Sequence, residues 1–509
     1  MRKFYLAIVS CFLILLLTAC SDEAGANPDT TEKPSNDETD ESAVEEVVEE
    51  KYSQVVAVAD LEDRDYGGLT FTWAGPVLRD INPEESEVKE LWFNRIKELE
   101  EKWNFKFVSK TLSGDFIGNY IRTTLAGDPV GDIVYINTPS FFPSLPENGI
   151  AYPISDLDVV DLDDPKWVQS ARRASEYKGK TYSVRPGSAE TIAPRDGIFW
   201  NKTLFENLGL PNLYELYENG EWTWEKMMEI ADIATRDVDN DGEVDIYGLL
   251  GYYLPWDFIY SNGGEAVSQT KDGIEVNLND LKTTEALEFY QTVYKDYSHV
   301  FIPEDVEGIG FAEGNLAMMV YEWWIADWSF AHGKMDDNYG YLPFPSGPSN
   351  ENPENPVSFG MTESLEIMLA TVNKPKEKLE IWDEITNIGT AEDWERWTRE
   401  SYEAGADDAE SVEFAQLLEK NIKTNLIYGF ADLRKVITDL FTEIKEGSTT
   451  VQSGLEAIDP QIKAAISEFK EHGVDLGISE EEIEETKKAL EDGTYDDGEV
   501  KEEEEEEEE

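Results

Sequence analysis

The segment from Asp237 to Asp245 carries the most specific chemistry in the sequence, because acidic residues alternate along it around a central glycine. We expect oxygen ligands, from side chains or a main-chain carbonyl, at Asp237, Asp239, Asp241, Glu243 and Asp245. These spacings, with Gly242 at the sixth position, are typical of a twelve-residue loop that binds Ca²⁺. Gly248 occupies the twelfth position, where a bidentate glutamate normally lies. The sequence therefore predicts a structural calcium site with altered coordination, and the alternative is an acidic turn without an ion.

Histidine chemistry and polyanion binding are both disfavoured by the composition. The three histidines, His299, His332 and His472, are too far apart to form a local metal motif or a catalytic triad. The net charge is −67, with 42 basic against 109 acidic residues. Such a chain is repelled by nucleic acids and anionic lipid headgroups, whose binding depends on clustered Lys and Arg.

The two ends of the chain are predicted to lie outside the folded body. Residues 1–19 combine a basic start with a short apolar run, which predicts a secretion signal. The run closes with Leu17-Thr18-Ala19-Cys20, which resembles the lipobox of bacterial lipoproteins and implies that acylated Cys20 anchors the protein to the membrane. An ordinary signal peptide with a chance cysteine is the alternative. Acidic, weakly apolar composition predicts a disordered tether over 20–60 and a disordered tail over 480–509.

Between these ends, alternating strand and helix patterns position the remaining candidate residues. The patterns predict strands at 69–73, 105–108 and 132–136, and helices at 85–103 and 116–125. A βαβαβ order favours a parallel sheet, and open parallel sheets bind ligands at the carboxyl ends of their strands. Trp73, Tyr135 and Asn137 would lie at those ends. Similar signals from a strand at 197–202 to about residue 445 predict a second α/β unit.

Several short motifs, taken in order, resemble the extracellular solute-binding proteins of ABC importers, family 1. They are Leu125-Ala126-Gly127-Asp128, Gly131-Asp132-Ile133-Val134-Tyr135, Ile198-Phe199-Trp200-Asn201-Lys202, and Phe311-Ala312-Glu313-Gly314-Asn315-Leu316-Ala317-Met318-Met319 followed by Trp323-Trp324. The resemblance covers about residues 65–470. Asn315, where the family usually has lysine, and the long acidic tail depart from the pattern.

The resemblance implies an α/β fold of the two-lobe, periplasmic-binding-protein-like type II class, with a hinge and an interlobe ligand cleft. Lobe one would comprise residues 61–185 plus 360–425, and lobe two residues 190–356 plus 430–475. The crossing segments would lie near 184–186, 358–360 and 426–428. Such a hinge needs only a few residues to change conformation while each lobe stays rigid.

A carbohydrate ligand would need flat aromatic rings for its C–H faces and planar polar groups for its hydroxyls. The predicted substrate-binding residues are Trp73, Tyr135, Asn137, Glu190, Trp256, Asp257, Glu322 and Trp324. Arg79 and Arg195 are weaker candidates for donors to hydroxyl or carboxylate groups. For each tryptophan, core packing is the alternative, and Trp200, Trp222, Trp382 and Trp394 are assigned to the core.

The resemblance thus implies a non-enzymatic, monomeric, lipid-anchored receptor on the extracellular face of the cell membrane. It would capture a sugar, preferably an oligosaccharide, and deliver it to the permease subunits of an ABC transporter. A carbohydrate-active enzyme that uses paired carboxylates is one alternative, and a sugar-sensing scaffold on the same fold is another.

Overall fold

The computed structural model of the chain describes residues 52–76, 81–187, 196–270, 273–303, 309–360, 362–473 and 475–500. By its internal contacts the chain divides into residues 1–48 and 49–509, and every described residue belongs to the second part. Cys20, Arg79, Glu190 and Arg195 lie outside the described residues.

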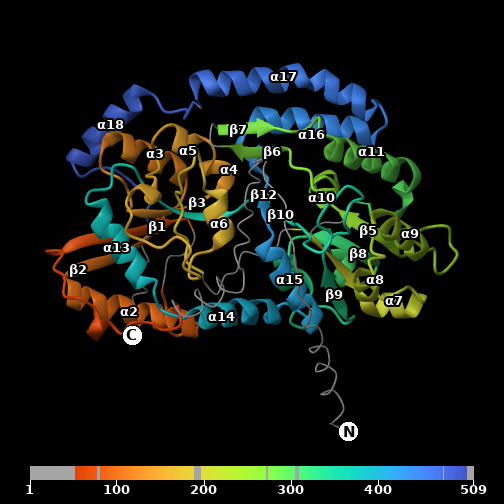
Figure 1. Ribbon diagram of the computed structural model, residues 1–509, viewed down its shortest axis with the longest axis horizontal. Helices are drawn as coiled ribbons and strands as arrows, with labels where there is room; N and C mark the ends of the chain where they lie inside the picture. Colours follow the sequence, from red (N-terminus) through yellow and green to blue (C-terminus); the bar gives the residue numbers. More distant parts are fainter. Residues whose placement is uncertain are drawn as a thin grey trace, which may run out of the picture. The chain divides into compact units, whose positions relative to one another are not determined.

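Lobe one is built on a four-stranded sheet with the order β11-β3-β1-β2 (Figure 1). Its strands are β1 (Leu69–Gly75), β2 (Phe105–Thr111), β3 (Ile133–Asn137) and β11 (Ser364–Met368). β1 pairs in parallel with β2 and β3, whereas β11 runs antiparallel to β3 and places Ser364 opposite Asn137. The predicted βαβαβ order and parallel pairing are confirmed.

Three helices of lobe one begin at a residue whose side chain caps the first turn, namely Ser86, Asp115 and Asn137. The Ser86 hydroxyl accepts a hydrogen bond from the Lys89 amide at 3.2 Å, which satisfies one donor of the first turn. The chain then leaves the long helix at Asn104, which has a left-handed backbone. The helices are α2 (Glu87–Trp103), α3 (Phe116–Ala126), α4 (Thr138–Phe141), α5 (Ser144–Glu147), α6 (Gln169–Ala174) and α13 (Pro375–Ile385).

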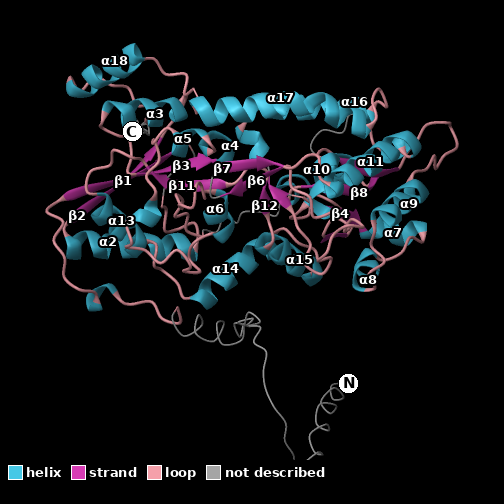
Figure 2. Ribbon diagram, turned by 45° about the horizontal axis from the view of Figure 1, so that its top comes forward, coloured by secondary structure: helices cyan, strands magenta, loops and turns pink. Residues whose placement is uncertain are grey.

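Lobe two contains the second four-stranded sheet, in the order β5-β8-β4-β9. Its strands are β4 (Gly197–Asn201), β5 (Tyr247–Gly251), β8 (Leu316–Tyr321) and β9 (Tyr339–Leu342), with a separate hairpin of β6 (Val267–Thr270) and β7 (Gly273–Val276). Its helices are α7 (Lys202–Leu208), α8 (Leu213–Glu218), α9 (Trp224–Ala234), α10 (Leu254–Ser261), α11 (Leu281–Asp296) and α12 (Ile309–Ala312). α16 (Ala431–Lys445) and α17 (Val451–His472) lie side by side and pack on α11 (Figures 1 and 2).

Short segments that cross between the lobes lie next to one another. β10 (Phe359–Gly360) pairs in parallel with β12 (Lys423–Thr424). The Asp196 amide, which precedes β4, donates a hydrogen bond to the Ser358 hydroxyl at 2.9 Å, just before β10. β10 and β12 lie near the second and third predicted crossings, whereas residues 188–195, which follow the first, lie outside the described residues, and the hinge positions stay a prediction.

The helices α14 (Ala391–Ala404) and α15 (Ala409–Lys420) connect the lobes, which corrects the placement of all of residues 360–425 in lobe one. α14 begins against lobe one, where Arg396 contacts Glu87 of α2 at 3.1 Å. It ends against lobe two, where the ring of Tyr402 lies 5.3 Å from that of Trp323. Figure 1 shows α14 running from the side of α2 toward α15.

α15 is held on lobe two by both apolar and polar contacts. It packs along β9, and its buried residues Val412, Ala415 and Leu418 join the core that surrounds Phe199. At its start, the Asp408 carboxylate accepts hydrogen bonds from Lys202 at 2.7 Å and from the Tyr214 hydroxyl at 3.1 Å. The sequence analysis assigned these residues to lobe one, and the contacts of α15 place its apolar face on lobe two instead.

Two stretches predicted as disordered are in part ordered. Val58, in the predicted tether, is buried, and the main-chain carbonyl of Val56 accepts a hydrogen bond from Arg95 at 3.1 Å. The predicted tail forms α18 (Glu480–Glu491), which packs on α3, and its continuation bridges Leu112 through Glu499 (Figures 1 and 2). A Ser479 capping box and apolar positions within the acidic run stabilise this helix, whereas bulk composition takes no account of such patterning.

The core consists of a large cluster that extends through both lobes and a smaller one around β4, β8 and α15. Among the described residues, no helix is long and apolar enough to cross a bilayer.

Candidate interlobe binding site

The edge of the lobe-one sheet that faces the crossing segments carries an ion pair. β3 ends at Asn137, and the main-chain amide of the neighbouring Glu363 donates a hydrogen bond to the Thr138 hydroxyl at 2.9 Å. Arg185 lies 3.8 Å from the buried Glu363 carboxylate. This polar strand edge is where an open α/β sheet binds ligands.

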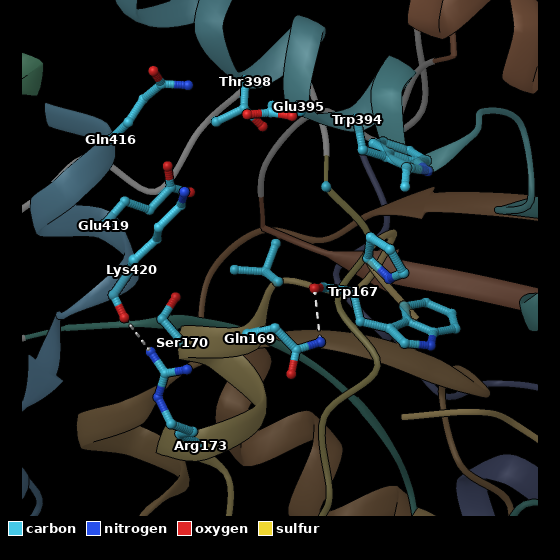
Figure 3. Close-up of a pocket in the computed structure, with 14 residues that line it drawn as sticks. Trp167, Gln169, Ser170, Arg173, Trp394, Glu395, Thr398, Gln416, Glu419 and Lys420 are labelled. Atoms are coloured by element: carbon cyan, nitrogen blue, oxygen red, sulfur yellow. Dashed lines mark hydrogen bonds between the residues drawn. The ribbon is translucent and has the colours of Figure 1, made fainter. Parts of the chain in front are cut away.

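A pocket of about 600 Å³ lies between the segment before α6 and the bridging helices. We call it the interlobe pocket. Its lining residues are Pro165, Trp167, Val168, Gln169, Ser170, Arg173 and Gly187 on the lobe-one side, and Ala391, Trp394, Glu395, Thr398, Gln416, Glu419 and Lys420 on α14 and α15. Figure 3 shows the two groups on opposite sides of one hollow. The pocket therefore takes side chains from a lobe-one segment and from helices that reach lobe two.

Two tryptophans line the interlobe pocket. Trp394 is held by an edge-to-face contact with Trp397, whose ring centroid lies 4.9 Å away. Gly187 lies against the Trp394 ring, since a Cβ atom at Gly187 would lie 3.0 Å from it. The indole nitrogen of Trp167 donates to the Asp161 carbonyl at 2.9 Å, which fixes that ring. Both rings are largely buried, at 3% exposed for Trp167 and 6% for Trp394, so each offers the pocket a small but rigid apolar area.

The polar wall of the pocket is set by α15. The Tyr402 hydroxyl donates a hydrogen bond to the Glu419 carboxylate at 3.0 Å. Burial is the main cause that raises the pKa of Glu419 from 4.5 to about 7, with a smaller contribution from Glu363. Across the pocket, the side-chain amide of Gln169 donates to main-chain carbonyls, including that of Leu162 at 3.2 Å. Planar amide and carboxyl groups thus lie beside the tryptophans, as recognition of sugar hydroxyls requires.

A second, more exposed aromatic group lies at the carboxyl ends of β5 and β8. Trp324 is 39% exposed, and its ring centroid lies 5.7 Å from that of Tyr321. Tyr321 in turn meets Tyr252, which is 43% exposed. The indole nitrogen of Trp324 donates to the buried carboxylate of Glu322. The structure thus brings the predicted residues Glu322 and Trp324 together, and their contact with a ligand stays a prediction.

Two of the predicted stacking residues are packed in the core instead. Trp73 is 7% exposed, its ring centroid lies 5.2 Å from that of Trp92, and its indole nitrogen donates to Glu366. Trp256 is 4% exposed and packs edge-on against Phe441. Both rings are packed in the core, and neither lines the interlobe pocket, so a stacking role for them stays a prediction. The sequence does not reveal this burial, because it results from contacts with other helices of the fold. α2 covers Trp73 through Trp92, and α16 covers Trp256 through Phe441.

The other predicted polar residues have varied surroundings. Asp257 is buried, and burial together with the nearby Asp196 raises its pKa well above the ordinary value. Tyr135 is partly exposed, and its hydroxyl lies 3.2 Å from that of Ser364. The Asn137 side chain caps α4 by accepting from the Ser140 amide. Glu190 lies outside the described residues.

The pocket residues that the sequence analysis missed come from distant segments. The sequence analysis assigned Trp394 to the core, and its side chain is indeed only 6% exposed. The same side chain also lines the interlobe pocket. Gln169, Gln416 and Glu419 lie on short or amphipathic helices with no motif around them. The polar residues on the inner face of α15 were the one available signal, since they interrupt its otherwise apolar stripe.

The family model for the bacterial extracellular solute-binding proteins matches residues 82–382, which is more than half of the chain. The chain belongs to this family. The predicted family resemblance is confirmed. No curated protein matches this solute-binding protein by sequence.

Solved structures share the two-lobe fold at low sequence identity. A cyclo/maltodextrin-binding protein complexed with maltotetraose has a TM-score of 0.55 and 13% identity, covering 81% of this chain and 98% of that chain. The extracellular solute-binding protein from Staphylococcus aureus in complex with maltose also has a TM-score of 0.55. Its sequence identity is 15%, and the match covers 78% of this chain and 98% of that chain. UgpB from Mycobacterium tuberculosis in complex with glycerophosphocholine has a TM-score of 0.51 and 16% sequence identity, and the match covers 79% of this chain and 99% of that chain.

The acidic loop of this solute-binding protein folds as a set of side-chain-capped turns. The Asp237 carboxylate accepts hydrogen bonds from the amides of Asn240 and Gly242, at 2.7 and 2.9 Å. Carboxylate oxygens of Asp237, Asp239 and Asp245 lie within 4.8 Å of one another. The structure therefore groups three of the five predicted ligands. Among the described residues, the Asp241 and Glu243 side chains do not join the group.

Close packing explains why the twelfth loop position is a glycine. A Cβ atom at Gly248 would lie 2.1 Å from the Ala231 carbonyl oxygen, because β5 packs directly on α9. The Gly248 amide donates instead to the Thr235 hydroxyl at 3.1 Å. A bidentate glutamate cannot occupy this position, and so a cation here would depend on the Asp237, Asp239 and Asp245 carboxylates.

Proposed function

We propose that this solute-binding protein captures a carbohydrate, preferably an oligosaccharide, in the interlobe pocket and presents it to the permease of an ABC transporter. Binding would proceed without bond cleavage and with the protein as a monomer. Closure of the two lobes about the crossing segments would enclose the sugar between lobe one and α14–α15.

One observation carries this proposal: immobilised tryptophan rings lie beside planar hydrogen-bonding groups in a pocket that reaches from one lobe toward the other. The small exposed part of Trp394 that lines the pocket offers apolar contact to a sugar ring, and Gln416 and Glu419 on α15 lie across the hollow from it (Figure 3). A volume of about 600 Å³ lies within the range of small-molecule sites. Two of the structural relatives hold maltotetraose and maltose, which supports a sugar as the ligand class.

The experiment compares ligand binding by matched α15 variants. Gln416→Ala removes a pocket amide, and Glu413→Ala removes an exposed side chain from the same helix. Titration calorimetry with maltotetraose, cellotetraose and mannotriose should detect a ligand whose affinity falls about tenfold in Gln416→Ala, as expected for one lost hydrogen bond of about 1.4 kcal/mol. Glu413→Ala should bind like the wild type.

Recovered sugar should be chemically unchanged after prolonged incubation, and its cleavage would favour an enzyme instead. Absence of binding to every saccharide class would refute the proposal.

We propose that Cys20 carries the lipid anchor, on the basis of the Leu17-Thr18-Ala19-Cys20 motif. The residues between this cysteine and the ordered body would then act as the tether at the extracellular face. Metabolic labelling with a radioactive fatty acid should mark the wild-type protein but not Cys20→Ala. Labelling of the variant would contradict the assignment.

We further propose that the Asp237–Asp245 loop binds Ca²⁺ as a structural ion. Three converging carboxylates repel one another, and a divalent cation would neutralise them. EDTA should lower the melting temperature of the wild type, and Ca²⁺ should restore it. Asp245→Asn should lose this response, whereas Glu229→Gln on the preceding helix should keep it. An EDTA response that persists in Asp245→Asn would refute the site.

A further inference from the structure

Beside the interlobe pocket, four cationic side chains gather around a second hollow, although the chain carries a net charge of −67. This hollow, which we call the basic hollow, has a volume of about 680 Å³. Its charged lining residues are Arg173, Lys282, Lys420 and Lys423, with Glu351 as the one carboxylate among the described residues that line it. The lining of this hollow is therefore positively charged, although the chain as a whole is strongly negative.

The basic hollow shares two lining residues with the interlobe pocket. Arg173 and Lys420 line both cavities. The Arg173 guanidinium donates a hydrogen bond to the Lys420 carbonyl at 3.3 Å, which joins the helix α6 to the end of α15 (Figure 3). The two hollows thus adjoin at the Arg173–Lys420 contact, and a ligand that occupies both would pass over this contact.

Within the described ranges, most of these cations lack a carboxylate at ion-pair distance, although Glu363 acts electrostatically on Arg173 and Glu419 on Lys420 from farther away. Among the described residues, the one ion pair within the set joins Lys282 to Glu351 at 3.9 Å. In the part of the chain that the structure describes, no carboxylate lies within 4.0 Å of Arg173, Lys420 or Lys423, although Glu265 shares a neighbouring hollow with Lys423. Elsewhere, exposed lysines often have close acidic partners, such as Lys435 with Asp439 at 2.6 Å.

Amide groups accompany the cations. The remaining polar lining residues of the basic hollow include Asn350, Asn352, Asn355 and Asn421. An asparagine amide can donate to one sugar hydroxyl and accept from another. Arginine and lysine bind carboxylate and sulfate oxygens through charge-assisted hydrogen bonds, which are about twice as strong as neutral ones. Hydroxyls and an anionic group on the same molecule would satisfy both sets of residues.

We propose that the ligand is an acidic oligosaccharide whose uronate carboxylate or sulfate lies among Arg173, Lys282, Lys420 and Lys423, while a neighbouring sugar unit occupies the interlobe pocket. This inference rests on the proposed carbohydrate-binding function and specifies its substrate class. The negative charge of the remaining surface is largely screened beyond about 8 Å at physiological salt, so the local cations decide the affinity.

The test uses a matched ligand pair. Trigalacturonate and its fully methyl-esterified form have the same sugar units but differ in charge. Calorimetry on the full chain should give tighter binding of trigalacturonate, by about tenfold for each well-placed charge-assisted hydrogen bond. A sulfated oligosaccharide distinguishes sulfate from carboxylate as the preferred anion. In Lys423→Gln and Lys282→Gln, the affinity ratio of acid to ester should fall several-fold, whereas Lys435→Gln should retain the wild-type ratio.

The two hypotheses fail in different ways. If the ester and neutral oligosaccharides bind as tightly as the acids, and the ratio is the same in all three variants, the acidic-sugar inference is wrong while carbohydrate binding stands. If no saccharide of either charge binds, both are wrong. If inorganic sulfate alone raises the melting temperature as much as trigalacturonate does, the basic hollow is a simple anion site and the inference is also wrong.

Discussion

Replacement of Glu419 by glutamine should remove a specific part of the pH dependence of stability. Burial raises the pKa of Glu419 from 4.5 to about 7, so folding favours its neutral form. A raised carboxyl pKa leaves stability intact below the unfolded value and lowers it as the pH rises through the folded value. The wild type should therefore lose stability between about pH 4.5 and pH 7 through this group, and Glu419→Gln should not.

The magnitude follows from the pKa change. At 1.36 kcal/mol for each pH unit, a rise from 4.5 to about 7 corresponds to roughly 3 kcal/mol. Glu419 is partly exposed, and solvent screening reduces the expected effect to about 2 kcal/mol. The neighbours that act on it are Tyr402, which donates its hydroxyl, Glu363, and the cations Lys420 and Arg185. Glutamine preserves the shape and can still accept from Tyr402.

The assay is urea unfolding of both proteins, followed by tryptophan fluorescence at closely spaced pH values from 4.5 to 8.5. Other buried acids, including Asp257 and Asp383, also have raised pKa values, and the difference between variant and wild type removes their contribution. The two midpoints should coincide near pH 4.5 and diverge toward pH 8, with the variant more stable. Parallel profiles across the whole range would show that Glu419 is not held in a desolvated site.

Three further outcomes are expected. Gly248→Glu, which restores the usual calcium ligand, should lower the melting temperature and not strengthen Ca²⁺ binding, because its Cβ would meet the Ala231 carbonyl; tighter Ca²⁺ binding by calorimetry would contradict this. Asp408→Ala should cost about 2–4 kcal/mol in urea unfolding, since it removes the α15 cap and the partners of Lys202 and Tyr214, and an unchanged midpoint would contradict it. Deleting residues 480–509 should lower the melting temperature and increase amide exchange in β2, whose end bonds to Val500; unchanged exchange would show that this segment does not stabilise lobe one.

The local sequence was sufficient to predict the elements that make the fold. β1 and β3 read as apolar or alternating runs bounded by turns, and α2 and α3 show helical periodicity with capping residues, because these signals depend on neighbours within a few residues. The order of the short motifs likewise predicted the family. Side-chain exposure could not be predicted in this way. Trp73 lies near the end of β1 and Trp324 lies just after β8. Trp73 is covered by α2 and α13, whereas Trp324 remains accessible.

The sequence by itself determined the α/β class, the presence of two α/β units, the acidic spacing of residues 237–245 and the large negative charge, because each depends on composition or short-range spacing. Only the tertiary structure decided which residues share a pocket. Gln169 and Gln416 are separated by more than two hundred residues, and they line one pocket because α15 packs on β9 and also contacts α6. The same packing joins Arg173 to Lys420 and concentrates positive charge locally in a strongly acidic chain, because spatial proximity, not abundance, determines the local potential.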